Sequence, residues 1–208
     1  MSFQGFGPDA CAWFTGLEAD NTKDYFAINR AVFDDQIKAP MQALLAAAQL
    51  RFGGEAKLFR QHRDVRFSKD KSPYKTACYG GVYNADHVMG WYFAIDRHGV
   101  YAGRGIYQMS PDQLANYRDA VVGPNSDGLA SAVAEAESAG LELSGSGTKG
   151  APRGYPKDHQ HIDLLRRKAL IIGGRSADVL GDAPWNHAEN CWAGAAPIAN
   201  WMDRALNL

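Results

Sequence analysis

The spacing of hydrophobic residues changes from helical to strand-like at Lys57, and this change indicates which elements the chain forms on either side. Before it, apolar side chains in residues 21–49 recur at helical spacing, and Pro40 is expected to break or kink that run because proline lacks a backbone donor. After it, residues 59–67 alternate apolar and charged side chains, as a strand does when one face is buried. The chain therefore passes from helical to extended structure near this point.

Further strands and helices follow the change of period. Three runs are rich in Tyr, Val, Phe and Trp and are joined by turn-like residues: Ala77–Tyr83, His87–Asp96 and Gly99–Tyr107. A helix is expected from Ser110, which can cap it, with Pro111 at the first helical position and Gln113 reaching back. Other helices are expected from Asn125 and from Pro184. This order favours an α+β fold, an antiparallel sheet of about four to six strands packed with N- and C-terminal helices.

Composition is that of an ordinary globular protein. The chain has 208 residues, of which 46% are hydrophobic, so we expect a single domain spanning residues 1–208. The formal net charge of −1 gives no global attraction to nucleic acid or membrane. The longest apolar stretch, Val88–Ile95, is too short to span a bilayer. Three cysteines without a C-x-x-C pair, and no signal-peptide pattern, indicate reduced thiols and a cytoplasmic protein.

Positive charge is concentrated in residues 57–75, which hold seven Lys or Arg and two Asp, a local charge of +5. Clustered cations suit a phosphate or carboxylate ligand, because guanidinium groups bind two oxygens at once and lysines neutralise charge. The candidate ligand-binding residues are Arg60, Arg63, Arg66, Ser68, Lys69, Lys71, Tyr74 and Lys75. The alternative is a structural segment, in which Arg60 or Arg66 pairs with Asp64 and the lysines are solvated.

Two residues are candidates for catalysis. Asp64 lies among cations that should lower its pKa, so it either fixes the guanidinium groups or serves as a base, and it is a better anchor than proton donor. His159 is a candidate general acid or base, since histidine titrates near neutrality. His159, His161 and Asp163 would share a face and could bind zinc or iron on a strand, but we interpret them as a helix start, where they diverge. The simpler role for His159 is a hydrogen bond to a loop. We predict no metal and no cofactor.

The aromatic residues of the expected strands have two interpretations. Tyr79, Tyr83, Trp91, Tyr92 and Phe93 could stack nucleic-acid bases beside the lysines. In strands, however, aromatic side chains usually pack in the core.

Two segments resemble a known family. RDVRFSKDKSPYKT, Arg63–Thr76, is similar to the hallmark of the uncharacterised domain of unknown function 2461 family, and PRGYPKDHQHIDLLRRK, Pro152–Lys168, resembles its second signature. No biochemical activity is established for that family. The resemblance implies that residues of the two signatures belong together: Arg60, Arg63, Asp64, Arg66, Lys69, Asp70, Lys71, Tyr74 and Lys75, with His159 and Lys168.

We therefore expect an Arg/Lys-rich strand–loop pocket that recognises an anionic small molecule, and our first hypothesis is an enzyme acting on a phosphorylated or carboxylated substrate. A second hypothesis is an RNA or single-stranded DNA binding module, which requires a basic stripe extending beyond one pocket. Arg153, Arg166, Arg167 and Lys168 could extend such a stripe. A third is a non-catalytic interaction scaffold whose charges only position a loop. The oligomeric state is not predicted.

Overall fold

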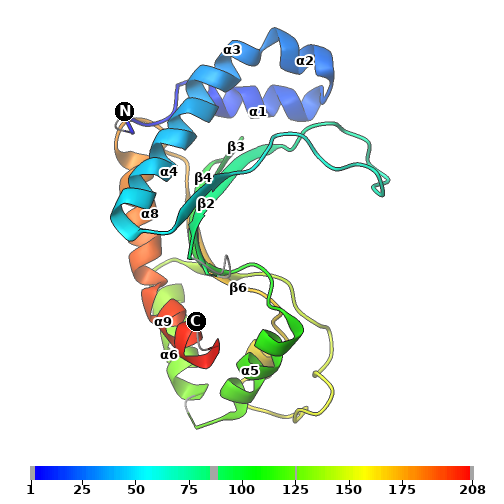
Figure 1. The fold of residues 1–208 in the computed structure, drawn as a ribbon, viewed down its shortest axis with the longest axis vertical. Coiled ribbons are helices and arrows are strands. Elements are labelled where there is room, and N and C mark those ends of the chain that lie inside the picture. Colours follow the sequence, from blue (N-terminus) through cyan, green and yellow to red (C-terminus); the bar gives the residue numbers. More distant parts are fainter. Residues whose placement is uncertain (1–2, 85–88, 125, 207–208) are drawn as a thin grey trace. The chain divides into compact units, whose positions relative to one another are not determined.

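The fold is α+β, as the sequence predicted (Figure 1). The computed structural model describes residues 3–84, 89–124 and 126–206. Its helices are α1 (Ala10–Ala19), α2 (Lys23–Ile28), α3 (Arg30–Val32), the π-helix η1 (Phe33–Lys38), α4 (Ala39–Phe52), α5 (Pro111–Val122), α6 (Ser126–Ser138), α7 (Ile162–Leu165), α8 (Ala183–Gly194) and α9 (Ala196–Leu206). Its strands are β1 (Glu55–Leu58), β2 (Ala77–Tyr83), β3 (Gly90–Asp96), β4 (Gly99–Ile106), β5 (Glu142–Ser144) and β6 (Leu170–Ser176). None of the described helices is long and apolar enough to cross a membrane.

The strands form one six-stranded antiparallel sheet in the order β1-β2-β3-β4-β6-β5. At one edge Leu58 of β1 pairs with Gly80 of β2, and at the other Ser144 of β5 pairs with Ile171 of β6. The six strands lie within the range that the sequence predicted, and the sheet joins the N-terminal helices to the C-terminal ones in the chain order expected of an α+β fold.

Contacts divide the chain into two compact units. The first comprises Met1–Tyr83, Tyr92–Ala102 and Arg175–Glu189, and the second Asn84–Trp91, Gly103–Gly174 and Asn190–Leu208. Strands β3, β4 and β6 contribute residues to both units. Division into contact units does not decide whether the whole chain folds as one domain, so the single domain over residues 1–208 stays a prediction.

The structure differs from two local expectations. Residues 59–67 do not form the predicted strand, since β1 ends at Leu58 and the segment after it has no regular secondary structure. Asp64 and Asp70 each accept a hydrogen bond from the backbone N–H two residues later, which favours turns over a ladder in that part of the chain. At Pro40, where a break or kink was expected, the chain stays helical but changes its bonding pattern: the π-helix η1 directly precedes α4, and Pro40 is the second residue of α4. Pro40 has no N–H to donate to Gln36 O, and that carbonyl accepts a bond from Gly7 N at 3.0 Å.

In the first unit, helices cover one face of the sheet. Helix α4 packs on β1 and β2, and Gly80 allows this approach, because a Cβ at that position would lie 2.5 Å from the Leu45 side chain (Figure 1). Cys78 and Phe93 are buried on this face, and the Phe93 ring stacks on Phe6 with 6.0 Å between ring centroids. Because successive strand residues point to opposite faces, the tyrosines that alternate with them lie on the other face.

Tyr74 anchors the segment that follows β1 to the N-terminal helices. Its ring is 6% exposed and stacks on Phe26 with 4.4 Å between centroids, and His62 lies 4.8 Å from it. The Asn21 side chain holds the same residue by its backbone: Tyr74 N donates to Asn21 Oδ1 at 3.0 Å, and Asn21 Nδ2 donates to Tyr74 O at 3.0 Å. The next helix, α2, is capped by Thr22. The amide of Asn21 is therefore left for this longer-range contact.

The second unit has its own apolar core between α5, α6, α9 and the end of the sheet. Tyr117 is fully buried there and donates to Leu164 O at 2.8 Å. The capping box predicted at Ser110 is confirmed, since Gln113 N donates to Ser110 Oγ at 3.2 Å and Ser110 N donates to Gln113 Oε1 at 2.8 Å. The predicted helix start at Asn125 and the first residues of the predicted strand His87–Asp96 lie outside the described residues.

Replacing Tyr74 by alanine should destabilise the protein strongly. The buried ring leaves a cavity against Phe26, so we expect the free energy of unfolding in urea to fall by about 3–5 kcal/mol. Tyr107→Ala is the matched control, because Tyr107 is 80% exposed and its loss should change stability by less than about 0.5 kcal/mol. Equal effects of the two substitutions would show that Tyr74 is not an anchor.

Candidate functional site

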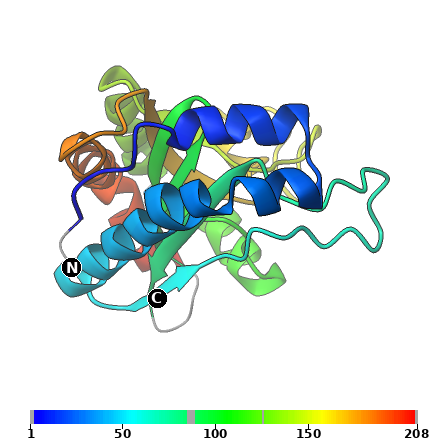
Figure 2. The same ribbon diagram turned by 90° about the horizontal axis from the view of Figure 1, so that it is seen from above.

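Residues 59–76, here called the arm, leave the sheet between β1 and β2 and return to it (Figures 1 and 2). The base of the arm is an irregular two-stranded ribbon. Phe59 N donates to Tyr79 O at 3.1 Å, Lys75 N to Gln61 O at 2.9 Å, and Arg63 N to Pro73 O at 2.9 Å. The arm is therefore held at its base by backbone bonds, while the part beyond Arg63 has no regular secondary structure.

The ribbon contains a bulge on its returning side. Leu58 pairs with Gly80, and His62 pairs with Tyr74, so the outgoing chain takes four steps where the returning chain takes six. Thr76 and Ala77 lie in this longer stretch. Extra residues of this kind re-aim side chains at the edge of a sheet, and both residues line the cavity described next.

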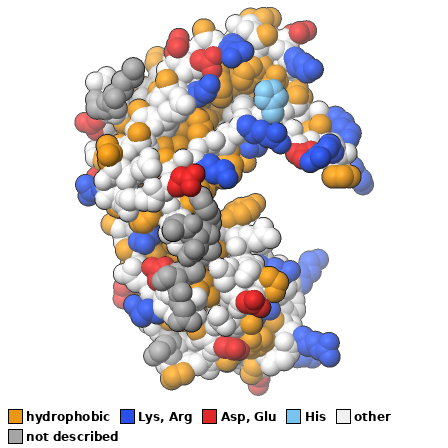
Figure 3. Space-filling model, in the orientation of Figure 1, with side chains coloured by type: hydrophobic (Ala, Val, Ile, Leu, Met, Phe, Trp, Pro, Cys, Tyr) orange, Lys and Arg blue, Asp and Glu red, His pale blue; other side chains and the backbone are white. Residues whose placement is uncertain are grey.

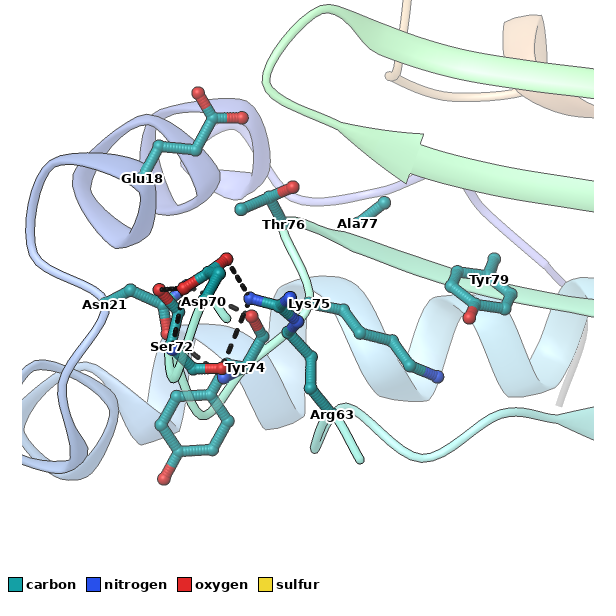
Figure 4. Close-up of a pocket in the computed structure, with 10 residues that line it drawn as sticks. All are labelled: Glu18, Asn21, Arg63, Asp70, Ser72, Tyr74, Lys75, Thr76, Ala77 and Tyr79. Atoms are coloured by element: carbon teal, nitrogen blue, oxygen red, sulfur yellow. Dashed lines mark hydrogen bonds and ion pairs between the residues drawn. The ribbon is translucent and has the colours of Figure 1, made fainter. Parts of the chain in front are cut away.

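A cavity of about 570 Å³ opens between the base of the arm, the end of α1 and β2 (Figure 4). Its lining is mostly polar: Glu18, Asn21, Arg63, Asp70, Ser72, Tyr74, Lys75, Thr76, Ala77 and Tyr79. All of these residues belong to the first unit. The site is therefore built within one compact part of the protein.

Asp70 ties the arm to itself within the cavity wall. It binds the Arg63 guanidinium through Nη1, and it accepts bonds from Ser72 Oγ at 2.6 Å and Ser72 N at 2.9 Å (Figure 4). The two bonds from Ser72 and the bond from Arg63 hold the pKa of the Asp70 carboxyl well below its usual range. Asp70 is consequently an anionic tether at neutral pH.

Lys75 carries the cavity's unbalanced charge. The two cavity carboxylates each have a guanidinium partner, since Asp70 pairs with Arg63, and Glu18 pairs with Arg97 at 3.0 Å. Lys75 forms no ion pair with a described carboxylate. Its Nζ instead lies 4.4 Å from the Tyr79 ring centroid, and Figure 4 shows the side chain extended along β2 toward that ring. A cation on an aromatic face keeps its charge and remains able to bind an anion.

The structure brings together only part of the predicted ligand site. Of the predicted ligand-binding residues, Arg63, Tyr74 and Lys75 line the cavity, whereas Arg60, Arg66, Ser68, Lys69 and Lys71 do not. Arg66 binds Asp64 through Nη2 at 2.6 Å, and Lys71 Nζ donates to Val65 O at 2.9 Å. Bonds from Arg66 lower the pKa of Asp64, with a smaller contribution from Arg60, as the sequence predicted. Asp64 is thus placed as an anchor on the arm.

Several lining residues were missed by sequence reasoning. Glu18 and Asn21 come from the N-terminal helical region, far from the basic segment in sequence, and no local pattern marks them. Thr76 was not predicted, and Tyr79 was considered only as a strand aromatic. No local pattern marks Tyr79 as a neighbour of Lys75, because their closeness depends on the bulge that contains Thr76 and Ala77.

His159 belongs to the second unit and is not among the residues that line the cavity. Its Nδ1 accepts a bond from His161 N at 3.1 Å, and His161 Nε2 contacts Asp127 Oδ1 at 2.9 Å. His161 immediately precedes α7, so the segment is a helix start, as interpreted from the sequence. In the described part of the chain, no group of three or more His, Cys, Asp or Glu residues could hold a metal ion. Catalytic roles for Asp64 and His159 stay predictions.

The cysteines offer no reactive thiolate. Burial raises the pKa of Cys78 to about 12 and that of Cys191 to about 11, and it also raises the pKa of Cys11. All three are free thiols. Burial therefore favours the protonated form of these thiols at neutral pH.

Comparison with known proteins gives a family model and no function. A model described as "Conserved hypothetical protein (DUF2461)" matches residues 9–201. The match includes the arm, the cavity and the segment around His159. No curated protein matches the sequence significantly. The matched description names no ligand and no reaction, so the site must be interpreted from its own geometry.

Removing the charge of Asp70 should loosen the arm. In Asp70→Asn the side-chain oxygen can still accept from Ser72, but the amide NH2 then faces Arg63 Nη1, and two donors cannot bond, so the tie to Arg63 is lost. We expect faster hydrogen–deuterium exchange in peptides covering residues 62–76 and unchanged exchange in the helices. Asp158→Asn, an exposed carboxylate far from the arm in sequence, is the control. Identical exchange in both variants and the wild type would contradict the tether.

The same tether predicts a pH dependence. Because the pKa of Asp70 is lowered in the folded protein, its contribution is fully present above the usual aspartate pKa and is lost as pH falls through the lowered value. The arm should therefore stay ordered at pH 4 and loosen only in stronger acid. A carbon-13 NMR titration of the Asp70 carboxyl should give a midpoint below the ordinary aspartate range, and Arg63→Gln should raise that midpoint. A midpoint within the ordinary range would refute this pairing.

Proposed function

The chain belongs to the DUF2461 family of conserved hypothetical proteins, as its motifs predicted, and since that description names no activity, we propose from the geometry that the cavity binds an anionic small molecule. The ligand group would be a phosphate or a carboxylate. The observation that carries the proposal is the position of Lys75, a cation that lines the cavity while both cavity carboxylates are already paired.

Charge balance supports an anion rather than a cation as ligand. Pairing of Glu18 with Arg97 and of Asp70 with Arg63 cancels the two negative charges at the cavity. Lys75 then leaves it with one net positive charge. In a recess partly shielded from water, such a charge attracts counter-ions more strongly than it would on an open surface.

Arg63 offers a second donor group. Both of its bonds, to Asp70 and to Ser72 O, use Nη1. A guanidinium has five N–H donors, so the edge formed by Nε and Nη2 stays available. That edge suits the two oxygens of a carboxylate or phosphate. Asp70 would thus serve the site by fixing the orientation of Arg63, which reduces the entropy lost when the anion binds.

The proposal concerns recognition and includes no reaction. Both carboxylates that line the cavity are ion-paired, which suits them to holding cations in place rather than to accepting a proton. Thr76 adds a hydroxyl that can select among anions by hydrogen bonding. A cytoplasmic location, inferred from the free thiols, belongs to the same proposal.

Lys75→Gln should weaken anion binding. A charge-assisted hydrogen bond contributes about 1.5–3 kcal/mol, so affinity should fall roughly ten- to a hundredfold. The measurement is isothermal titration with inorganic phosphate, pyrophosphate and a tricarboxylate, preceded by a thermal-shift screen of the same anions. Stability should change little, because Lys75 forms no ion pair with a described carboxylate.

Lys23→Gln provides the matched control, since it removes the same charge from the exposed surface of α2. Equal affinity in Lys75→Gln and Lys23→Gln would show that binding is nonspecific. Failure of every anion to bind the wild type would refute the proposed function.

A further inference from the structure

A row of aromatic rings crosses the face of the first unit that α4 does not cover. Phe59 at the base of the arm, Tyr79 of β2, Tyr92 of β3 and Tyr101 of β4 follow one another with centroid separations of 5.3, 6.0 and 5.9 Å. All four side chains are partly exposed. The buried residues that alternate with them, such as Cys78 and Phe93, face the other side. The tyrosines therefore do not serve as core, which is the usual role of strand aromatics.

Cations border this row. Lys57 Nζ lies 5.3 Å and Lys75 Nζ 5.8 Å from the Phe59 ring centroid, and neither lysine forms an ion pair with a described carboxylate. At the other end, the Arg175 guanidinium lies 5.8 Å from the Tyr101 ring and also binds Asp96 at 2.9 Å. Two unbalanced ammonium groups at one ring repel each other, so a bound anion there would relieve the repulsion. The row thus has a strongly positive end at Phe59.

The arm extends the positive charge away from the cavity. Arg60 and Lys69 are exposed and form no ion pair with a described carboxylate, and Lys and Arg side chains gather along the projecting arm (Figure 3). Phe67 is 98% exposed, and the Arg66 guanidinium lies 6.0 Å from its ring. An arm of cations with an exposed aromatic ring at its far end forms a basic stripe that extends beyond the cavity, which is the feature expected of a nucleic-acid binder.

We propose that the aromatic row and the arm bind single-stranded nucleic acid. Bases stack on Tyr79, Tyr92 and Tyr101, and phosphodiester groups contact Lys57, Lys75 and the cations of the arm. Aromatic side chains on neighbouring strands of an antiparallel sheet provide one platform per base, and every base has a face that can stack. This inference rests on the proposed function, because it identifies the anion held at Lys75 as a phosphate of the strand.

The extent of the surface favours a strand over a free nucleotide. A mononucleotide needs one ring and one cationic group, whereas here several rings and separated cations follow one another from β4 to the arm. A duplex has its bases stacked internally and offers no free faces to the tyrosines. The cations suit the phosphates of a strand, and the exposed rings suit bases whose faces are free. The surface therefore fits a strand of unpaired bases.

The test uses the full chain and labelled single-stranded DNA and RNA of about 15 nucleotides, followed by fluorescence anisotropy at 50 and 200 mM salt. Tyr92→Leu removes the central platform and keeps an apolar side chain. We expect its affinity for the oligonucleotide to fall roughly five- to a hundredfold. Tyr107→Leu, an exposed tyrosine outside the row, should bind as the wild type does.

A charge substitution on the arm gives a second measurement. Because Lys69 lies outside the strands, replacing it should not disturb the sheet. Lys69→Glu should lower affinity and flatten the dependence of binding on salt, whereas Lys23→Glu on α2 should leave both nearly unchanged. Both side chains are exposed, so thermal melting should be the same for the two variants. Equal effects of the two would overturn the role of the arm.

Phosphate binding separates this inference from the proposed function. Tyr92→Leu should still bind pyrophosphate, because Tyr92 does not line the cavity. If the wild-type protein binds pyrophosphate but no oligonucleotide, the nucleic-acid inference alone is overturned. The same holds if mononucleotides bind as tightly as 15-mers. Duplex binding as tight as that of single strands, or Tyr92→Leu binding like Tyr107→Leu, would overturn the stacking role. If the wild type binds neither pyrophosphate nor an oligonucleotide, the proposed function is refuted as well.

Discussion

Burial of the Tyr74 ring against Phe26 is the interaction on which the arm, the cavity and the position of Lys75 depend. Fixing backbone costs about 1–2 kcal/mol per residue, and a segment without regular structure must recover this cost from side-chain contacts. Here those contacts lie at the base of the arm, where Asn21 also binds the backbone of Tyr74. Lys75 follows directly and is therefore held beside Tyr79. The distant part, around Phe67, makes no such contact and is presented to solvent.

Pairing of opposite charges decides where the positive charge of the basic segment can act. Asp70 pairs with Arg63 and Asp64 pairs with Arg66, which are two of the three arginines that the sequence placed in an anion pocket. The lysines at positions 57, 69 and 75 form no ion pair with a described carboxylate. The available charge therefore lies at the base and along the length of the arm. This distribution explains why one segment contributes both an unbalanced cation to the cavity and a longer basic stripe along the arm.

Much of the fold could be predicted from sequence, because it depends on local rules. The capping box at Ser110 is specified by residues within one helical turn, and the strand-forming runs after Ala77 are specified by their composition. The errors arose where local rules compete. Alternation predicted a strand beyond Phe59, but aspartate side chains bind the backbone there in turns. The helix continues through Pro40, because a π-helix precedes it and Gly7 N bonds the Gln36 carbonyl that the proline cannot reach. Family membership followed from long motifs, while the match names no activity.

The helices, the strand-forming segments and the excess of positive charge between residues 57 and 75 can be read from the sequence, since periodicity, capping and composition are properties of neighbouring residues. Three features depend on the folded chain: which arginines are neutralised, which residues of α1 and the following loop complete the cavity, and which face of the sheet the helices leave uncovered. Strand alternation places Tyr79, Tyr92 and Tyr101 on one side of their strands, but packing of α4 against Gly80 selects the opposite side as the core. The physical reason is that charge pairing and burial depend on distances between residues far apart in the chain.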